Sequence, residues 1–150
     1  MARLEKVLGR FYFVRWQEIE ASDMEELIDS MTQYGAEHGR PPVYVAIQGD
    51  DYREPKPAVR STLLAFFAKL IKLIETDYVV IAATGVKASL QRSAMRAMMT
   101  VGRIARADLS RVVVLSSVGD VLEREKAHLP APAAQVLASL REAGILDAET

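Results

Sequence analysis

The segment covering residues 78–117 constrains the fold of this chain more than any other stretch. It begins with a continuous apolar run over residues 78–83, rich in β-branched side chains, which is typical of a strand buried on both faces. A Thr-Gly pair breaks the run, a helical pattern follows over residues 87–106, and a second apolar strand covers residues 111–116. This succession predicts a right-handed βαβ unit with parallel strands.

The same pattern extends toward the N-terminus. Aromatic and β-branched residues predict a strand over residues 10–18, and an apolar run predicts another over residues 43–47. Between them we expect a helix that a capping box at Ser22 opens and that Gly39 ends. Whether residues 4–8 form a partner strand or only lead into the first strand stays open at this point.

The next helix carries more apolar surface than one contact needs. It follows a polar connection over residues 48–56 and is predicted over residues 57–75. Its apolar arc covers about half of the helix circumference, whereas one packed face needs only ~100°. The surplus must meet a neighbouring helix or another chain.

Two further helices complete the chain, one over residues 119–126 and one that follows a proline-containing linker and ends at Gly144. We therefore predict the α/β class, with a mostly parallel sheet of four to five strands and packed helices. Residues 1–128 would form the domain and residues 129–150 a C-terminal helical appendage.

Composition excludes several functional classes. The chain of 150 residues has no cysteine and two histidines, which excludes disulfides, cysteine nucleophiles, thiolate zinc sites and histidine-rich metal sites. A net charge of −1 argues against a nucleic-acid partner. No apolar run reaches the ~18 residues of a membrane span, and the N-terminus lacks the apolar core of a signal peptide. We expect a cytoplasmic protein without a metal or cofactor.

Carboxylates gather in the polar connection, where Asp50, Asp51 and Glu54 could hold magnesium or transfer protons. The sequence supplies no nearby nucleophile or phosphate cradle, and Arg53 and Lys56 neutralise the group. We interpret the segment as a solvated loop and predict no catalytic residue.

A second candidate lies between the strand 78–83 and the following helix. Gly85, Lys87 and Ser89 could bind an anion there, because backbone N–H groups are free at a helix start. Their order matches neither phosphate-binding glycine motif. An ordinary strand-to-helix turn explains the same residues, and we favour it.

The helix 87–106 carries arginines and methionines on the side opposite its apolar stripe. A solvated basic face is one explanation, and a partner-binding face is the other, because arginine and methionine are enriched at interfaces while lysine is depleted. The residues of this face are Arg92, Met95, Arg96, Met99 and Arg103.

The closing part of the domain contains a recognisable series of segments. They are Tyr78-Val79-Val80-Ile81, Gln91-Arg92-Ser93, Ala107-Asp108-Leu109, Val112-Val113-Val114 and the run from Ser117 to Glu123. With these segments, the order of elements over about residues 10–125 resembles the STAS domain, also called SpoIIAA-like, of anti-sigma factor antagonists.

The resemblance implies a domain without enzymatic activity that binds protein partners, or in some relatives a small ligand, near the loop before the central helix. Phosphorylatable members of the family carry Asp-Ser-Ser/Thr-Gly in this loop. Residues 49–57 contain no serine or threonine here, and Ser61 and Thr62 follow a turn later. The usual phosphorylation switch is therefore not expected.

Together these observations predict a non-catalytic interaction or regulatory module, part of a signalling complex or a homodimer. Its partner, another protein or a second copy, would contact Asp50, Asp51, Tyr52 and Arg60, or the arginine face. Two alternatives remain open. One is a small enzyme or nucleotide-binding protein that uses residues 84–89 with Asp50 and Asp51. The other is a lipid or small-molecule carrier that uses the apolar face of the helix 57–75.

Overall fold

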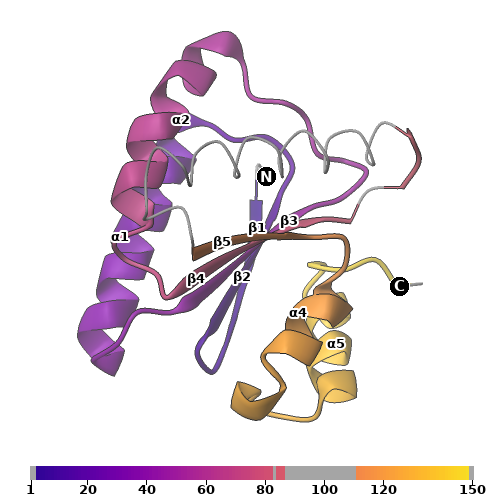
Figure 1. Cartoon of the computed structure of the whole chain (residues 1–150). Helices are drawn as coiled ribbons and strands as arrows, with labels where there is room; N and C mark the ends of the chain where they lie inside the picture. The colour runs from indigo at the N-terminus through magenta and orange to yellow at the C-terminus, as the bar shows by residue number, and fades with distance from the viewer. Residues whose placement is uncertain (1–2, 83, 87–110, 149–150) are drawn as a thin grey trace.

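A computed structural model describes residues 3–82, 84–86 and 111–148, shown in colour in Figure 1. The predicted helix 87–106 lies outside these residues, as do the side chains of Arg60, Ser61 and Leu64. The described part is an α/β structure around one five-stranded sheet.

The strands lie side by side in the order in which they occur along the chain. They are β1 (Arg3–Leu8), β2 (Phe11–Trp16), β3 (Val43–Gln48), β4 (Thr76–Ile81) and β5 (Val112–Leu115). β1 pairs antiparallel with β2, and all the other pairs are parallel. The predicted mostly parallel sheet is confirmed, and residues 4–8 prove to belong to a partner strand.

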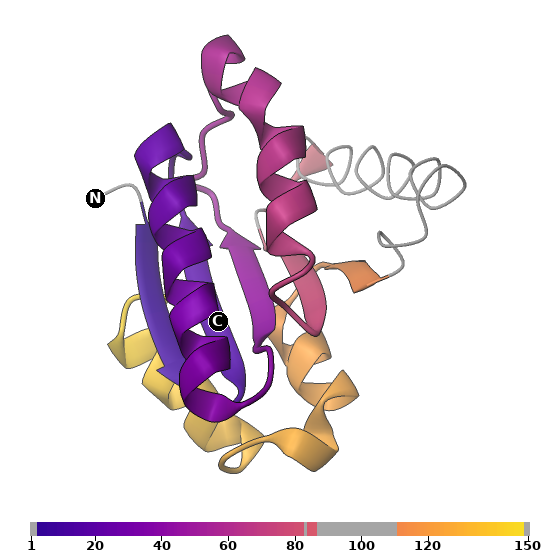
Figure 2. The ribbon, with the colours of Figure 1, turned by 90° about the vertical axis from the view of Figure 1, so that its left-hand side faces the viewer.

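Helices cover the two faces of the sheet separately (Figures 1 and 2). α1 (Ala21–His38) and α2 (Pro57–Leu70) lie on one face. α4 (Val118–Arg124) and α5 (Ala133–Glu142) lie on the other, joined through a single 3-10 turn at Lys126–His128.

Each face has its own apolar core, because side chains alternate between the two faces along every strand. Under α1 and α2, Tyr12, Val14 and Trp16 of β2 pack with residues such as Leu27 and Leu70. On the opposite face, strand residues pack against α4 and α5. They include Phe11, Phe13, Val45 and Val80, and they meet Val121, Val136, Leu140 and Ile145. The helix α5 thus contributes buried side chains to the second core, and the division of the chain at residue 129 stays a prediction.

The start of α1 differs from the sequence prediction. The helix begins at Ala21 with Glu20 as its N-cap, and the Glu20 backbone N–H donates to Asp23 Oδ2 at 3.2 Å. The predicted capping box at Ser22 is therefore wrong, because the Glu20–Asp23 pair provides the same reciprocal capping earlier in the chain. The predicted end is confirmed: Gly39 has the left-handed φ of 68°, and its N–H donates to Gly35 O.

The helix α2 ends at Leu70, earlier than the predicted residue 75. Carbonyls of the turn that follows the helix accept hydrogen bonds from a distant part of the chain. Arg111 Nη1 donates to Ile71 O and Ile74 O, at 3.3 Å each. A long-range arginine therefore stabilises the turn that ends the helix.

The edge strand β1 is tied to α1 through Arg3. Its guanidinium pairs with Glu5 (2.6 Å), with Asp23, and with Glu26 (2.7 Å). Glu5 also accepts a hydrogen bond from Tyr12 Oη at 2.8 Å. Charged, exposed residues on an edge strand oppose pairing with another sheet.

Candidate functional site

The carboxyl ends of the parallel strands bring several polar segments together. Gln17 follows β2, residues 49–56 follow β3, and Thr84 lies just beyond β4. In α/β proteins this edge of the sheet is where ligands and partners usually bind. We call Arg15, Gln17, Asp50, Asp51, Thr84 and Asp147 the carboxyl-edge cluster, because hydrogen bonds connect them here.

Arg15 is the centre of the cluster. It belongs to β2, points to the face that α5 covers, and is only 8% exposed. Its Nη2 lies 3.0 Å from Asp51 Oδ1, and its Nη1 lies 3.0 Å from Asp147 Oδ1. Nη1 also lies 3.4 Å from Ile145 O. A buried guanidinium needs such partners, because an unpaired buried charge is costly.

Asp51 is held by two side chains. Besides Arg15, Gln17 Nε2 donates to Asp51 Oδ2 at 2.9 Å. Burial alone would raise the pKa of Asp51, but the hydrogen bonds from Gln17 and Arg15 and the charge of Arg15 outweigh it and lower that pKa. Asp51 keeps 38% of its side chain exposed, as expected of a solvated loop, but its ion-pair partner is the buried Arg15, whereas Arg53 and Lys56 were the cations that the sequence suggested.

The backbone of residues 49–56 is anchored to its neighbours. The Arg53 N–H donates to Gln17 O at 2.6 Å, and the Tyr52 N–H donates to Gly49 O at 3.2 Å. The Thr84 N–H donates to Asp50 Oδ1 at 3.1 Å. These bonds fix the loop against the ends of β2 and β4.

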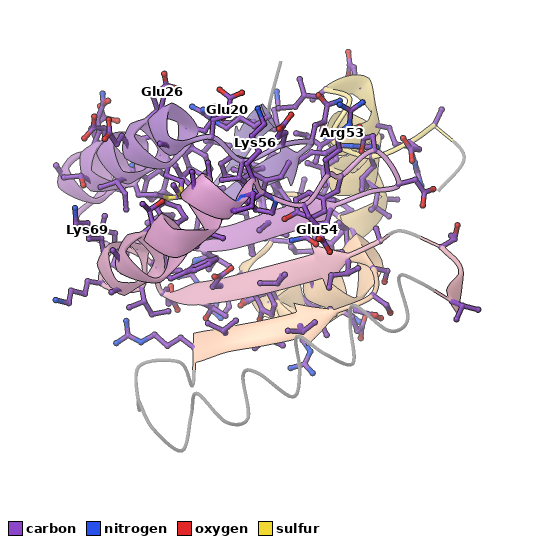
Figure 3. The ribbon with its side chains drawn as sticks, turned by 90° about the horizontal axis from the view of Figure 1, so that it is seen from above. Glu20, Glu26, Arg53, Glu54, Lys56 and Lys69 are labelled. Atoms are coloured by element: carbon purple, nitrogen blue, oxygen red, sulfur yellow. The ribbon has the colours of Figure 1, made fainter. Side chains whose placement is uncertain are left out.

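Several side chains of this loop face outward. Arg53, Glu54 and Lys56 are exposed and are labelled in Figure 3 along the chain that leads from β3 into α2. Tyr52 is half-buried and packs against the core under α1 and α2. Burial, with a smaller effect of the Glu54 charge, raises the pKa of its hydroxyl. The outward surface therefore combines one anchored aromatic ring with charges of both signs.

The predicted site residues are only partly brought together. Asp50, Asp51 and Tyr52 share the anchored loop, and Gly85 (φ 96°) follows Thr84, which contacts Asp50. Arg60 belongs to α2, but its side chain is not described. The remaining predicted residues lie outside the described part: Lys87, Ser89, Arg92, Met95, Arg96, Met99 and Arg103.

The turn at Thr84 is poorly suited to bind an anion, because a carboxylate lies beside it. Its first amide already donates to the Asp50 carboxylate, so that donor is occupied. A carboxylate beside the turn would also repel a phosphate. The described contacts therefore favour the ordinary-turn explanation of residues 84–86.

The structure buries only part of the wide apolar arc of α2. Phe66 and Leu70 are buried in the core, and Val59 and Leu63 are partly buried against it. Phe67 is 40% exposed. Apolar surface thus remains on α2 that the described residues do not cover.

Sequence reasoning missed Arg15 and Asp147 as a pair. They lie 132 residues apart, and no periodic pattern connects them. One signal was present, because Arg15 is the only charged residue in the otherwise apolar and aromatic β2. A charged side chain in a strand that is buried along its whole length requires a counter-ion.

In the described ranges, no three His, Cys, Asp or Glu side chains are grouped so that they could hold a metal ion. No helix in those ranges is long and apolar enough to cross a membrane. Comparison with known proteins adds no relative: no family model fits the chain, and neither a curated protein nor a solved structure matches it.

Proposed function

We propose that this chain is a non-catalytic, cytoplasmic interaction or regulatory module with a STAS-like arrangement, which binds another protein or a second copy of itself. The binding surface would be residues 50–56 with Arg60, or alternatively the arginine face, Arg92–Arg103. Signalling complexes and homodimers are the assemblies that such a module would serve.

The anchored loop after β3 carries this proposal. Its backbone is fixed by the Arg53–Gln17 and Thr84–Asp50 bonds, while Arg53, Glu54 and Lys56 stay exposed. A loop that is already ordered loses little conformational entropy when a partner binds. An aromatic ring within a rim of mixed charge is also typical of protein interfaces.

The chemistry of the cluster points the same way. Asp51 is engaged with Arg15 and Gln17, and Asp50 with the Thr84 amide, so both carboxylates have structural partners. A general base needs a carboxylate that can reach a substrate proton. The partners of Asp50 and Asp51 leave the exposed charges of the loop as its most accessible groups.

A capture experiment tests the proposal. Tagged protein should retain a stoichiometric partner from native lysate, or light scattering should give the mass of a dimer. Replacing Arg53 and Lys56 with glutamate should weaken the captured complex or the dimer. The matched control is Lys72→Glu with Lys126→Glu, which makes the same change in charge at exposed sites outside the loop.

Equal loss in both double variants would show that net charge matters and the loop does not. A monomer without a partner would contradict the proposal itself. Replacing Arg96 and Met99 with glutamate tests the arginine face in the same way. Unchanged partner binding would show that this face is not the binding surface.

A further inference from the structure

Arg15 joins two segments that the chain connects only at long range. On one side it holds Asp51, and with it the loop after β3. On the other it holds the C-terminal tail that follows α5, through Asp147 and the carbonyl of Ile145. One buried guanidinium therefore belongs to two otherwise separate contacts.

Both segments are anchored by few other bonds close to Arg15. In the tail, the Ile145 and Leu146 N–H groups donate to Leu140 O at 2.9 and 3.3 Å. Asp147 itself is largely exposed, with 64% of its side chain accessible. In the loop, the Arg53 N–H bond to Gln17 O ties the backbone to the end of β2.

The two contacts depend on each other for physical reasons. The tail acceptors fix the orientation of Nη1, and the guanidinium is planar, so they also fix where Nη2 points toward Asp51. The tail also keeps Arg15 nearly free of solvent, and an ion pair weakens when water reaches it. Repulsion between the Asp51 and Asp147 carboxylates acts in the opposite direction, but Asp147 is mostly solvated.

We propose that Arg15 makes the C-terminal tail and the loop 49–56 a coupled pair, so that release of either segment loosens the other. Such coupling is reciprocal by thermodynamic necessity. A partner that draws Asp51 away from Arg15 would then free the tail, and a partner that takes the tail would loosen the loop. The coupling belongs to the isolated chain and does not rest on the proposed partner.

Residue-resolved amide hydrogen exchange on the full chain tests this coupling. In Asp147→Ala, exchange at the Arg53 amide should rise at least about twofold, the lower limit expected for residues that share one interaction partner. In Asp51→Ala, exchange at the Ile145 and Leu146 amides should rise by a similar factor. Arg15→Lys should raise both, because an ammonium cannot reproduce the two-sided fork of a guanidinium.

Matched controls remove an exposed carboxylate from the same segments without touching Arg15. They are Glu142→Ala at the end of α5 and Glu54→Ala in the loop, and neither should change exchange in the other segment. The Val45 amide, in the middle of β3, reports global unfolding. Changes confined to the mutated segment, slower exchange in the distant segment, or a rise no larger than that at Val45 would each overturn the coupling.

Discussion

Asp77 lies directly opposite Tyr44 on the neighbouring strands β4 and β3. Both side chains point toward the core under α1 and α2, where Asp77 is 1% and Tyr44 3% exposed. The Oδ1 atom of Asp77 has no hydrogen-bond partner among the described residues. Burial raises the pKa of this carboxyl to about 7, and burial, with the Asp77 charge second, raises the pKa of the Tyr44 hydroxyl.

Asp77→Asn should make stability less dependent on pH. The folded chain keeps the Asp77 proton up to about pH 7, whereas the unfolded chain releases it near its ordinary value of 3.8. The contribution of Asp77 to the free energy of unfolding is therefore highest below about pH 4 and falls as pH rises toward 7, by up to about 1.4 kcal/mol per pH unit. Urea unfolding at pH 5 and pH 8 should show wild type losing more stability than the variant. Parallel losses in the two proteins would contradict an elevated pKa.

Tyr44→Phe should destabilise the fold by about 1–3 kcal/mol. The Trp16 Nε1–H donates to Tyr44 Oη at 2.8 Å inside the core, and the variant leaves this buried donor without its acceptor. Trp16 is the only tryptophan in the chain, so its fluorescence reports the unfolding transition directly. Tyr52→Phe removes a hydroxyl from a half-buried ring and serves as the control, for which we expect a smaller loss.

Gly49→Ala should act through Arg15. A Cβ atom at this position would lie 2.8 Å from Arg15 Nη2 and 3.2 Å from Asp51 Oδ1, closer than packing allows. The guanidinium would have to shift away from the new methyl group and so disturb its ion pairs with Asp51 and Asp147. We therefore expect the free energy of unfolding to fall by about 1–3 kcal/mol. Gly35→Ala, inside α1, should instead stabilise by about 0.5–1 kcal/mol, because alanine is the better helix former. Thermal unfolding distinguishes the two, and equal shifts would refute the steric argument.

Arg3→Gln should lower the melting temperature most at low ionic strength. The variant removes the charge that holds Glu5, Asp23 and Glu26 together. Arg3 keeps only 14% of its side chain exposed, but its partner Glu26 is 63% exposed, and water weakens an exposed ion pair. We therefore expect the free energy of unfolding to fall by about 1 kcal/mol. Raising salt from about 0.01 M to about 1 M should reduce the difference from wild type. A difference that does not respond to salt would show that packing of the arginine stem matters more than its charge.

The parallel sheet could be predicted because the pattern that produces it lies within short stretches of the sequence. Strands buried on both faces need continuous apolar runs, and residues 43–47 and 78–83 carry them. The end of α1 was equally local, since Gly39 supplies the left-handed residue that ends the helix.

Features that depend on contacts between distant residues have no comparable local pattern in the sequence. The turn that follows α2 is bonded by Arg111, some 40 residues away, whereas the apolar periodicity in the sequence continues past Leu70. Glu20 and Asp23 cap the start of α1 in place of Ser22 and Glu25, because two capping patterns overlap within a few residues. In the carboxyl-edge cluster the sequence identified the loop residues Asp50 and Asp51, but it identified neither Arg15 in β2 nor Asp147 in the tail.

The order of the strands has a consequence for how the chain is made. Because β1 to β5 lie side by side in chain order, each strand pairs with the strand synthesised just before it. Domains generally fold from the N-terminus as they leave the ribosome, and such neighbouring pairings can form progressively. Arg15 is an exception, because its partner Asp147 lies 132 residues further along the chain and is translated long after β2. During synthesis β2 therefore carries an incompletely paired charge, and the nascent sheet reaches its final electrostatic balance only when the tail emerges.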